Sequence, residues 1–286
     1  MKTLRSVDDL REALRGERRA GRSIGLVPTM GFFHEGHLSL IRRARERCDV
    51  VVVSLFVNPA QFAPGEDLEG YPRNEERDLE LARQEGVDLV FAPSVDEVYP
   101  AGFAASVEVG GLTDTLEGDP RQRGSHHFPG VTTVVTKLFN MVGPDVAFFG
   151  QKDAQQALVV RKLVRDLDIP VEIEVCPTVR DSGGLALSSR NAYLSPEEKE
   201  QALALNRALR AAEAHVARGE LDADTVLAAA RGELDAAGIE PDYLELRSAT
   251  DLSRVERVNG STLLAVAARV GTARLIDNTI LQGGPR

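Results

Sequence analysis

Short apolar runs alternate with amphipathic segments through about the first 176 residues of the chain. Runs of this kind, bounded by Gly, Pro or charged residues, are typical of strands buried on both faces of a parallel sheet. The segments between them, such as residues 38–47 and 154–167, carry apolar positions at helical spacing. The expected strands are residues 24–27, 50–57, 87–92, 146–149 and 171–175. Strand, helix and strand repeated in this order predict an α/β fold with a Rossmann-like, doubly wound parallel sheet.

The pattern changes after Arg190. Ser195 is a candidate helix cap, followed by Pro196 in the first turn and Glu198 at the capping-box position. Two Ala- and Leu-rich helices are expected, ending near residues 218 and 237. A half-buried strand at 243–247 and a hairpin of 263–269 with 273–276 follow. We therefore expect one domain over residues 1–178 and a second, smaller α+β domain over residues 179–286.

Composition and charge argue against several classes of protein. The 286 residues carry 34 Lys and Arg against 44 Asp and Glu, a net charge of −10. This balance argues against a protein that coats nucleic acid or an anionic membrane, but it leaves room for a local phosphate site. No apolar stretch reaches the roughly 20 residues that span a bilayer, and the N-terminus is too charged for a secretory signal. We expect a cytoplasmic protein in which Cys48 and Cys176 are buried, without metal or disulfide spacing.

The segment from Val27 to Leu38 carries the strongest chemical signal. An apolar strand runs into a turn with Gly31, and a helix opens near Gly36, at the sheet edge where ligands bind. A helix N-terminus suits phosphate, and His34 and His37 would project toward the same ligand. A P-loop has Lys in place of His37, and the chain has no G-x-G-x-x-G. Zinc and a purely structural histidine pair remain the alternatives here.

Three further groups of polar residues come directly after expected strands or lie at the expected domain junction. Residues 149–156 place Lys152 beside a helix start, where Asp153 caps that helix or accepts from a ribose hydroxyl. Residues 179–191 combine two glycines, three serines and two arginines, a flexible clamp for an anion or a Ser-rich surface linker. Residues 54–62 present the side-chain amides of Asn58 and Gln61, which can bind a carboxylate or hydroxyl without adding charge.

Two long loops are expected, over residues 58–72 and 110–130. Loops of this length in a compact domain are usually functional, although a solvated crossover is the alternative. We expect Asp78, with residues 71–73, to close the first loop over a ligand. The second loop holds His126 and His127, to which the sequence assigns no role. Together these constellations indicate nucleotide phosphate chemistry with a small polar co-substrate.

At these residues the sequence resembles the pantothenate synthetases (pantoate–β-alanine ligases), within the HxGH nucleotidyltransferase superfamily. HxGH alone marks only the superfamily, whereas FVNPAQF, KDAQQ and LSSRN together are specific to these enzymes. The matching blocks cover most of residues 24–194 and run in family order: PTMGFFHEGHLSLI, VVVSLFVNPAQF, EDLEGYPR, HFPGVTTVVTKLFN, FFGQKDAQQ and GLALSSRNAYL. The family differs at Gln151, where many members have Glu, and at Ala154, where many have an aromatic residue.

The resemblance implies an ATP-dependent, AMP-forming ligase that condenses (R)-pantoate with β-alanine through pantoyl adenylate. Residues 1–178 would bind ATP and pantoate, residues 179–286 would cover them, Mg²⁺ would enter with ATP, and the protein would be a homodimer. The residues implied as catalytic are His34, His37, Lys152 and Arg190. Those implied to bind ATP are Met30, Gly31, His34, His37, Gly150, Gln151, Lys152, Asp153, Val179, Leu187, Ser188, Ser189 and Arg190. Pantoate would be held by Gln61, Gln156 and Asn58, and no protein metal ligand is expected.

Two rival functions remain. Another adenylyltransferase of the same superfamily would keep the HxGH motif, but it has no reason to share FVNPAQF and KDAQQ. A non-catalytic ATP-sensing module could lose its phosphate cations, yet His34, His37, Lys152 and Arg190 are all present.

Overall fold

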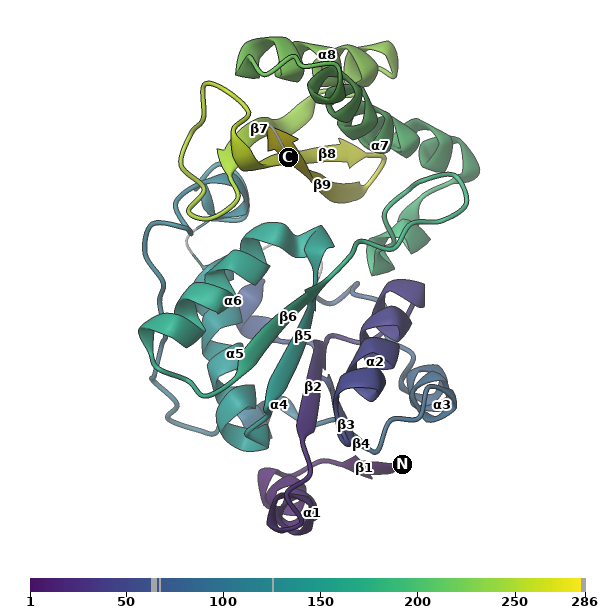
Figure 1. Cartoon of the computed structure of the whole chain (residues 1–286). Coiled ribbons are helices and arrows are strands. Elements are labelled where there is room, and N and C mark those ends of the chain that lie inside the picture. Colours follow the sequence, from purple (N-terminus) through teal and green to yellow (C-terminus); the bar gives the residue numbers. More distant parts are fainter. Residues whose placement is uncertain (63–65, 67, 125, 284–286) are drawn as a thin grey trace. The chain divides into compact units, whose positions relative to one another are not determined.

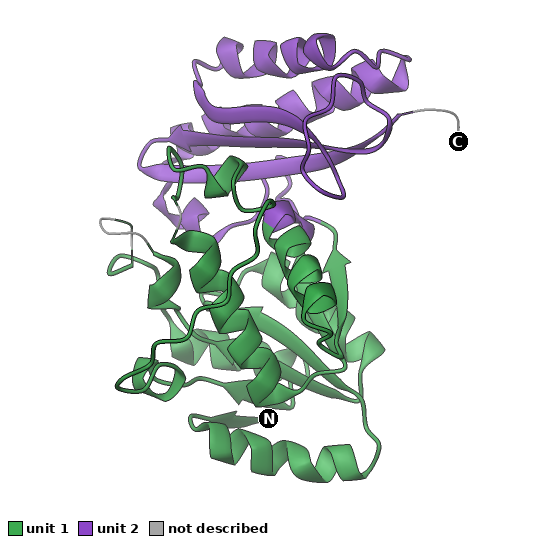
Figure 2. Ribbon diagram, turned by 90° about the vertical axis from the view of Figure 1, so that its left-hand side faces the viewer, with its two compact units in different colours: residues 1–150, 156–177 green, residues 151–155, 178–286 purple. Residues whose placement is uncertain are grey.

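A computed structural model describes residues 1–62, 66, 68–124 and 126–283 of the chain (Figure 1). Contacts between Cα atoms divide it into two compact units, coloured separately in Figure 2. Unit 1 comprises Met1–Gly150 and Gln156–Pro177, and unit 2 comprises Gln151–Gln155 and Thr178–Arg286. The segment 151–155 therefore packs with unit 2, although it follows directly from a strand of unit 1. The division into domains at residue 178 stays a prediction.

Unit 1 is built on a six-stranded, wholly parallel sheet in the order β1-β4-β3-β2-β5-β6. The order reverses at β2, because β3 and β4 follow on one side of it and β5 and β6 on the other, so the fold is the predicted doubly wound α/β type. Its strands are β1 (Lys2–Leu4), β2 (Ile24–Thr29), β3 (Val50–Leu55), β4 (Leu89–Phe91), β5 (Val146–Gly150) and β6 (Glu172–Cys176).

The helices of unit 1 cover both faces of this sheet. Figure 1 shows α2 (Glu35–Arg47) and α3 (Glu75–Gln84) on one side, and α5 (His127–Val142) and α6 (Ala154–Asp166) on the other. Leu38, Ile41 and Ala44 of α2 are buried against the sheet, as their spacing predicts. The remaining elements of unit 1 are α1 (Val7–Arg19), α4 (Val95–Val98) and the short 3-10 helices η1 (Pro59–Gln61) and η2 (Leu116–Gly118), whereas the 3-10 helix η3 (Gln151–Asp153) belongs to unit 2.

Unit 2 is the smaller α+β part that the sequence predicts. An antiparallel sheet in the order β7-β8-β9 packs against α7 and α8, and the helices lie on one face of it (Figure 1). The elements are η4 (Ser189–Tyr193), α7 (Pro196–Ala217), α8 (Ala223–Ala236), β7 (Pro241–Ser248), β8 (Gly260–Val270) and β9 (Ala273–Gly283). Helix α7 begins at the predicted capping box, in which the side chains of Ser195 and Glu198 each accept a backbone N–H of the other residue.

Two expectations need correction. The strand predicted at 273–276 continues to Gly283, past two adjacent polar residues, Asp277 and Asn278. The loop predicted over 110–130 ends earlier, because α5 begins at His127, whose side chain is buried. Part of the other predicted loop, residues 63–65 and 67, lies outside the described residues.

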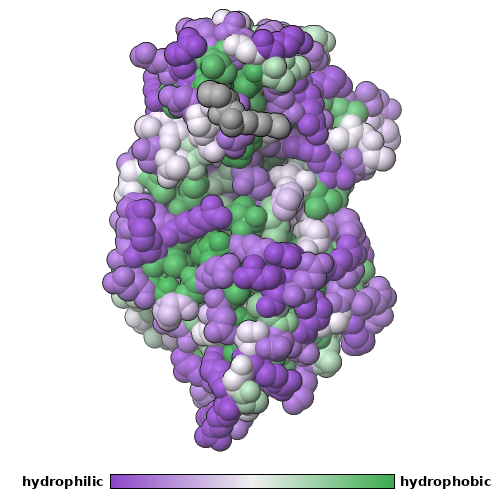
Figure 3. All heavy atoms as spheres, viewed as in Figure 1, coloured by the Kyte–Doolittle hydropathy of each residue, from purple (hydrophilic) through white to green (hydrophobic). Residues whose placement is uncertain are grey.

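The surface is mainly polar. Hydrophilic residues cover most of the face drawn in Figure 3, and the large apolar side chains exposed in the described chain are Met1, Val95 and Leu167. None of the helices in the described ranges is long and apolar enough to cross a membrane.

Candidate active site

A side chain of α3, Asp78, holds the backbone of the turn that follows β2. Gly31 has φ +84°, and a Cβ there would lie 2.6 Å from Leu55 Cδ1, so glycine is required. The two carboxylate oxygens of Asp78 accept the backbone N–H groups of Phe32 and Phe33, each at 2.7 Å. Burial raises the pKa of Asp78, and the two backbone donors lower it in part. The expectation that Asp78 closes over a ligand is wrong, because its carboxylate is buried beneath the turn.

His34 and His37 form a reciprocal cap at the N-terminus of α2. His34 Nδ1 accepts the N–H of Gly36 at 3.1 Å, and His37 Nδ1 accepts the N–H of His34 at 3.3 Å. The ring centroids lie 4.1 Å apart. A nitrogen that accepts a backbone N–H cannot carry the proton of a neutral ring, so that proton is on Nε2 in both rings. The cap therefore turns both histidines into Nε2–H donors at the positive end of a helix.

The amides of Asn58 and Gln61 lie at the end of β3, beside the same turn. Asn58 Nδ2 donates to Gln61 Oε1 at 3.2 Å and to Gly130 O at 3.1 Å, and its Oδ1 accepts the hydroxyl of Tyr99 at 2.8 Å. Gln61 Nε2 in turn contacts Met30 Sδ at 2.9 Å. Asn58 is buried with both amide donors in use, which leaves Gln61 as the better placed group for a ligand.

His127 fastens α5 to the backbone that carries Gln61. Its Nδ1 lies 3.1 Å from Gln61 O, and its Nε2 lies 3.1 Å from a guanidinium nitrogen of Arg123. Because the carbonyl only accepts and the guanidinium only donates, the proton of the ring is on Nδ1. Burial, with Arg123 beside the ring, lowers the pKa of His127 to about 4. Arg123 also forms an ion pair with Glu66, so this contact joins the two long loops.

Close approach of backbones explains Gly130. A Cβ at this position would lie 2.2 Å from Ala60 O and 2.7 Å from Gln61 Cα. Helix α5 can therefore pack directly on η1, which holds Gln61, only with glycine here.

In unit 2 the short turn η3 carries Lys152 and Asp153. Lys152 Nζ lies 3.9 Å from Asp153 Oδ1, and the lysine side chain is 19% exposed. The backbone carbonyls of Gln151 and Lys152 accept from Asn278 Nδ2 on β9, at 3.0 and 2.8 Å. Asn278 Oδ1 accepts from Gln151 Nε2 at 2.9 Å. The turn is thus anchored to β9 by a single buried amide.

Residues 179–187 form a hydrogen-bonded turn, where the sequence predicts a loop. Arg180 and Ala186 pair as an antiparallel bridge, and Leu187 N donates to Val179 O at 3.0 Å. Asp181 Oδ1 accepts from the N–H groups of Gly183 and Leu185. Ser188 then caps η4, which holds Ser189 and Arg190, by accepting the N–H of Arg190. Local backbone bonds therefore shape the Ser-rich segment before any ligand binds.

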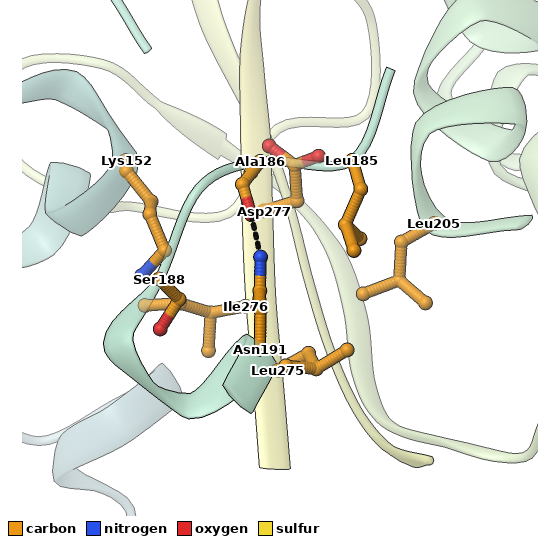
Figure 4. Close-up of a pocket in the computed structure, with 9 residues that line it drawn as sticks. All are labelled: Lys152, Leu185, Ala186, Ser188, Asn191, Leu205, Leu275, Ile276 and Asp277. Carbon is orange, nitrogen blue, oxygen red and sulfur yellow. Dashed lines mark hydrogen bonds between the residues drawn. The ribbon is translucent and has the colours of Figure 1, made fainter. Parts of the chain in front are cut away.

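A small pocket in unit 2 is lined by Lys152, Ser188, Asn191 and Asp277, among others (Figure 4). Asn191 Nδ2 donates to Ala186 O at 3.0 Å, the dashed bond of Figure 4. Asn191 Oδ1 is buried, and among the described residues it has no hydrogen-bond partner. A buried acceptor of this kind suits a donor group supplied from outside the chain.

The predicted site residues thus form two groups. Unit 1 holds Met30, Gly31, His34, His37, Asn58 and Gln61 around the turn after β2, with Gly150 ending β5 and Gln156 half-buried on α6. Unit 2 holds Gln151, Lys152, Asp153, Val179, Leu187, Ser188, Ser189 and Arg190. The described residues contain no group of three His, Cys, Asp or Glu side chains that could bind a metal ion.

The sequence alone did not indicate the contacts of His127, Gly130, Asp277 and Asn278, and it indicated a different role for Asp78. One signal was available, since Asp277 and Asn278 are adjacent polar residues inside an otherwise apolar strand. For Asp78 and Gly130 the partners lie 45 or more residues away, so no local pattern indicates these contacts.

Known proteins resemble this chain over nearly its whole length. A family model described as "Pantoate-beta-alanine ligase" matches residues 2–280. The chain is 52% identical over 283 residues to a pantothenate synthetase of Moorella thermoacetica, covering 99% of each chain. A pantothenate synthetase structure from Thermus thermophilus superposes with a TM-score of 0.93 at 47% identity, over 99% of this chain and 100% of that one.

A ligase structure from Francisella tularensis, complexed with beta-gamma ATP and beta-alanine, has a TM-score of 0.81 at 33% identity over the whole of both chains. The match to the family model spans nearly the whole chain, and the identities above extend over its full length. The chain therefore belongs to the pantoate–β-alanine ligase family.

Proposed function

We propose that this chain joins (R)-pantoate to β-alanine in two steps, with ATP consumed to AMP and pyrophosphate. In the first step a carboxylate oxygen of pantoate attacks the α-phosphorus of ATP, and the bond to the bridging oxygen of pyrophosphate breaks. In the second, the β-alanine amine attacks the acyl carbon, the C–O bond to AMP breaks, and the amine loses a proton. No covalent bond to the enzyme forms in either step.

The observation that carries this proposal is the cap of His34 and His37 at the N-terminus of α2. Negative charge grows on the α-phosphoryl oxygens and on the departing pyrophosphate in the first step. Two Nε2–H donors and the positive end of a helix are aimed groups of the kind that stabilise such charge, each worth about 3–4 kcal/mol in a dry site. His37 is proposed to give its proton to the departing group.

The groups of unit 2 are proposed to act on the same nucleotide. Lys152 and Arg190 would neutralise phosphate charge, with Ser188 and Ser189 as hydroxyl donors. Asp153 would accept from the ribose, Val179 would contact the adenine side, and Leu187 would form part of the phosphate clamp with Ser188, Ser189 and Arg190. The small pocket beside Lys152 contains the buried acceptor Asn191 Oδ1. This acceptor supports the proposal that a ligand with hydrogen-bond donors binds there.

Gln61 and Gln156 are proposed to hold pantoate, whose carboxylate and hydroxyl groups need donors and acceptors without added charge. The hydrogen bonds of Asn58 favour an indirect part for it, through the orientation of Gln61. Mg²⁺ is proposed to enter with the triphosphate and to be held by phosphate oxygens. The homodimer stays a prediction.

The test is exchange of labelled pyrophosphate into ATP. Because the first step is reversible and needs no amine, we expect exchange that depends on pantoate and proceeds without β-alanine. The measurement is radioactivity in ATP after incubation with pantoate, and the control replaces pantoate with other short hydroxy acids.

Each result separates the alternatives. Exchange supported equally by an unrelated acid would indicate a different adenylyltransferase. A folded protein that binds ATP yet shows no exchange with any acid would indicate a sensing module and contradict the proposal.

A further inference from the structure

Two adjacent residues of β9 contact both of the segments of unit 2 that the proposed function assigns to ATP. Asn278 contacts the turn 151–153, and Asp277 contacts the turn 179–187. Successive side chains of a strand point to opposite faces, so neighbouring residues can reach different segments. The Asp-Asn pair is therefore the place in unit 2 where the two segments share one support.

Asn278 holds the lysine turn by its backbone. The side chain is 5% exposed, and its two N–H groups serve the carbonyls of Gln151 and Lys152, while its oxygen accepts from Gln151 Nε2. All of its hydrogen-bonding groups but one lone pair are used. Because the bonds go to backbone carbonyls, they set the course of the chain at Lys152 and hence the direction of its side chain.

Asp277 holds the other segment through Arg180. The carboxylate is 3% exposed and meets the guanidinium in two parallel bonds of 2.6 and 2.9 Å. Arg180 also donates to Gly184 O at 3.1 Å, so the ion pair is tied to the tip of the turn. Asp277 Oδ1 accepts in addition the N–H of Asn278, at 2.8 Å.

Such a buried pair is a poor source of stability alone. The cost of removing two charges from water roughly cancels their attraction, and apolar residues of similar volume often serve stability as well. A paired, fork-shaped contact does fix geometry. This contact involves Asp277, which lines the same pocket as Lys152 and Ser188 (Figure 4). Its location indicates that it orients the residues of the site.

We propose that Asp277 and Asn278 are positioning residues for the nucleotide, which hold Lys152 and the Ser188–Arg190 segment in the geometry needed for adenylyl transfer. This inference rests on the proposed function. It extends that function to a strand which the sequence motifs do not include.

The test compares Asn278→Asp with wild type in pantoate-dependent pyrophosphate exchange. The substitution keeps size and one acceptor, but it sets a carboxylate oxygen against the carbonyls of Gln151 and Lys152. We expect the KM for ATP to rise at least tenfold and the KM for pantoate to change less than twofold. Asp277→Asn, which weakens the hold on Arg180, should shift the same parameter. Asn259→Asp, at an exposed asparagine of the same unit, is the matched control and should change neither constant.

Affinity for a non-hydrolysable ATP analogue, measured by calorimetry, gives a readout that does not need turnover. Weaker binding by Asn278→Asp, with the wild-type far-ultraviolet circular dichroism retained, supports the proposal. A variant that unfolds at lower temperature, with kcat, both KM values and the analogue affinity unchanged, would show that the pair serves folding alone. If the aspartate variant does not fold, Asn278→Ser removes the same bonds without adding charge. Absence of exchange in wild type would instead count against the proposed function, whereas the analogue affinities would still test this inference.

Discussion

At the scale of a residue, His127 shows how burial decides a charge state. Its ring lies between a carbonyl that needs a donor and a guanidinium that needs an acceptor. Only the neutral ring with its proton on Nδ1 satisfies both, and a second proton on Nε2 would face the donors of Arg123. The sequence shows His126 and His127 side by side, and it gives no way to tell which of the two is buried.

This arrangement predicts a dependence of stability on pH. The pKa is about 4 in the fold against about 6.5 for an unperturbed histidine, so the unfolded chain binds the extra proton first as pH falls. The contribution is complete above about pH 6.5 and is lost as pH falls toward 4, by about 3 kcal/mol in all. Urea unfolding at several pH values should show this loss in wild type and not in His127→Asn. His126→Asn, at the exposed neighbour, should titrate like wild type. If the free energy of unfolding changed with pH equally in all three proteins, His127 would not be held neutral in the fold.

At the scale of an element, β9 explains a failure of the hydrophobic pattern. The alternation of apolar and polar residues predicts a strand that stops at residue 276. Adjacent side chains of a strand point to opposite faces, so one of two adjacent polar residues would have to face the core. The strand continues because each polar group of Asp277 and Asn278 finds a partner that is distant in sequence. Patterns report burial, and they cannot report a hydrogen bond to a residue 97 or 126 positions away.

The contact of α5 with η1 makes a second prediction at this scale. Gly130→Ala places a methyl group 2.2 Å from Ala60 O, a backbone atom that can move only with η1. We expect a loss of about 1–3 kcal/mol in the free energy of unfolding, together with a higher KM for pantoate, because Gln61 moves with η1. Gly16→Ala, in α1 with open space around it, is the control and should stabilise by up to about 1 kcal/mol. A Gly130→Ala enzyme with unchanged stability and KM would refute the close approach.

At the scale of the whole molecule, strands, helices and turn motifs were predictable because each is encoded locally. The doubly wound sheet, the capping box at Ser195 and the placement of His34 and His37 at a helix start follow from spacing alone. The supports of the site do not, since Asp78, Gly130 and Asn278 act across long sequence separations. The net charge of −10 is compatible with a triphosphate ligand only if a few aimed groups attract it locally.

Activation of pantoate by adenylyl transfer is testable with pantoate labelled by oxygen-18 in its carboxylate. The oxygen that attacks the α-phosphorus stays with the phosphoryl group when the amine displaces it. With ATP and β-alanine present, we predict one labelled oxygen in AMP for each pantothenate formed, measured by mass spectrometry. Label found in inorganic phosphate, or AMP formed without label, would contradict adenylyl transfer to pantoate.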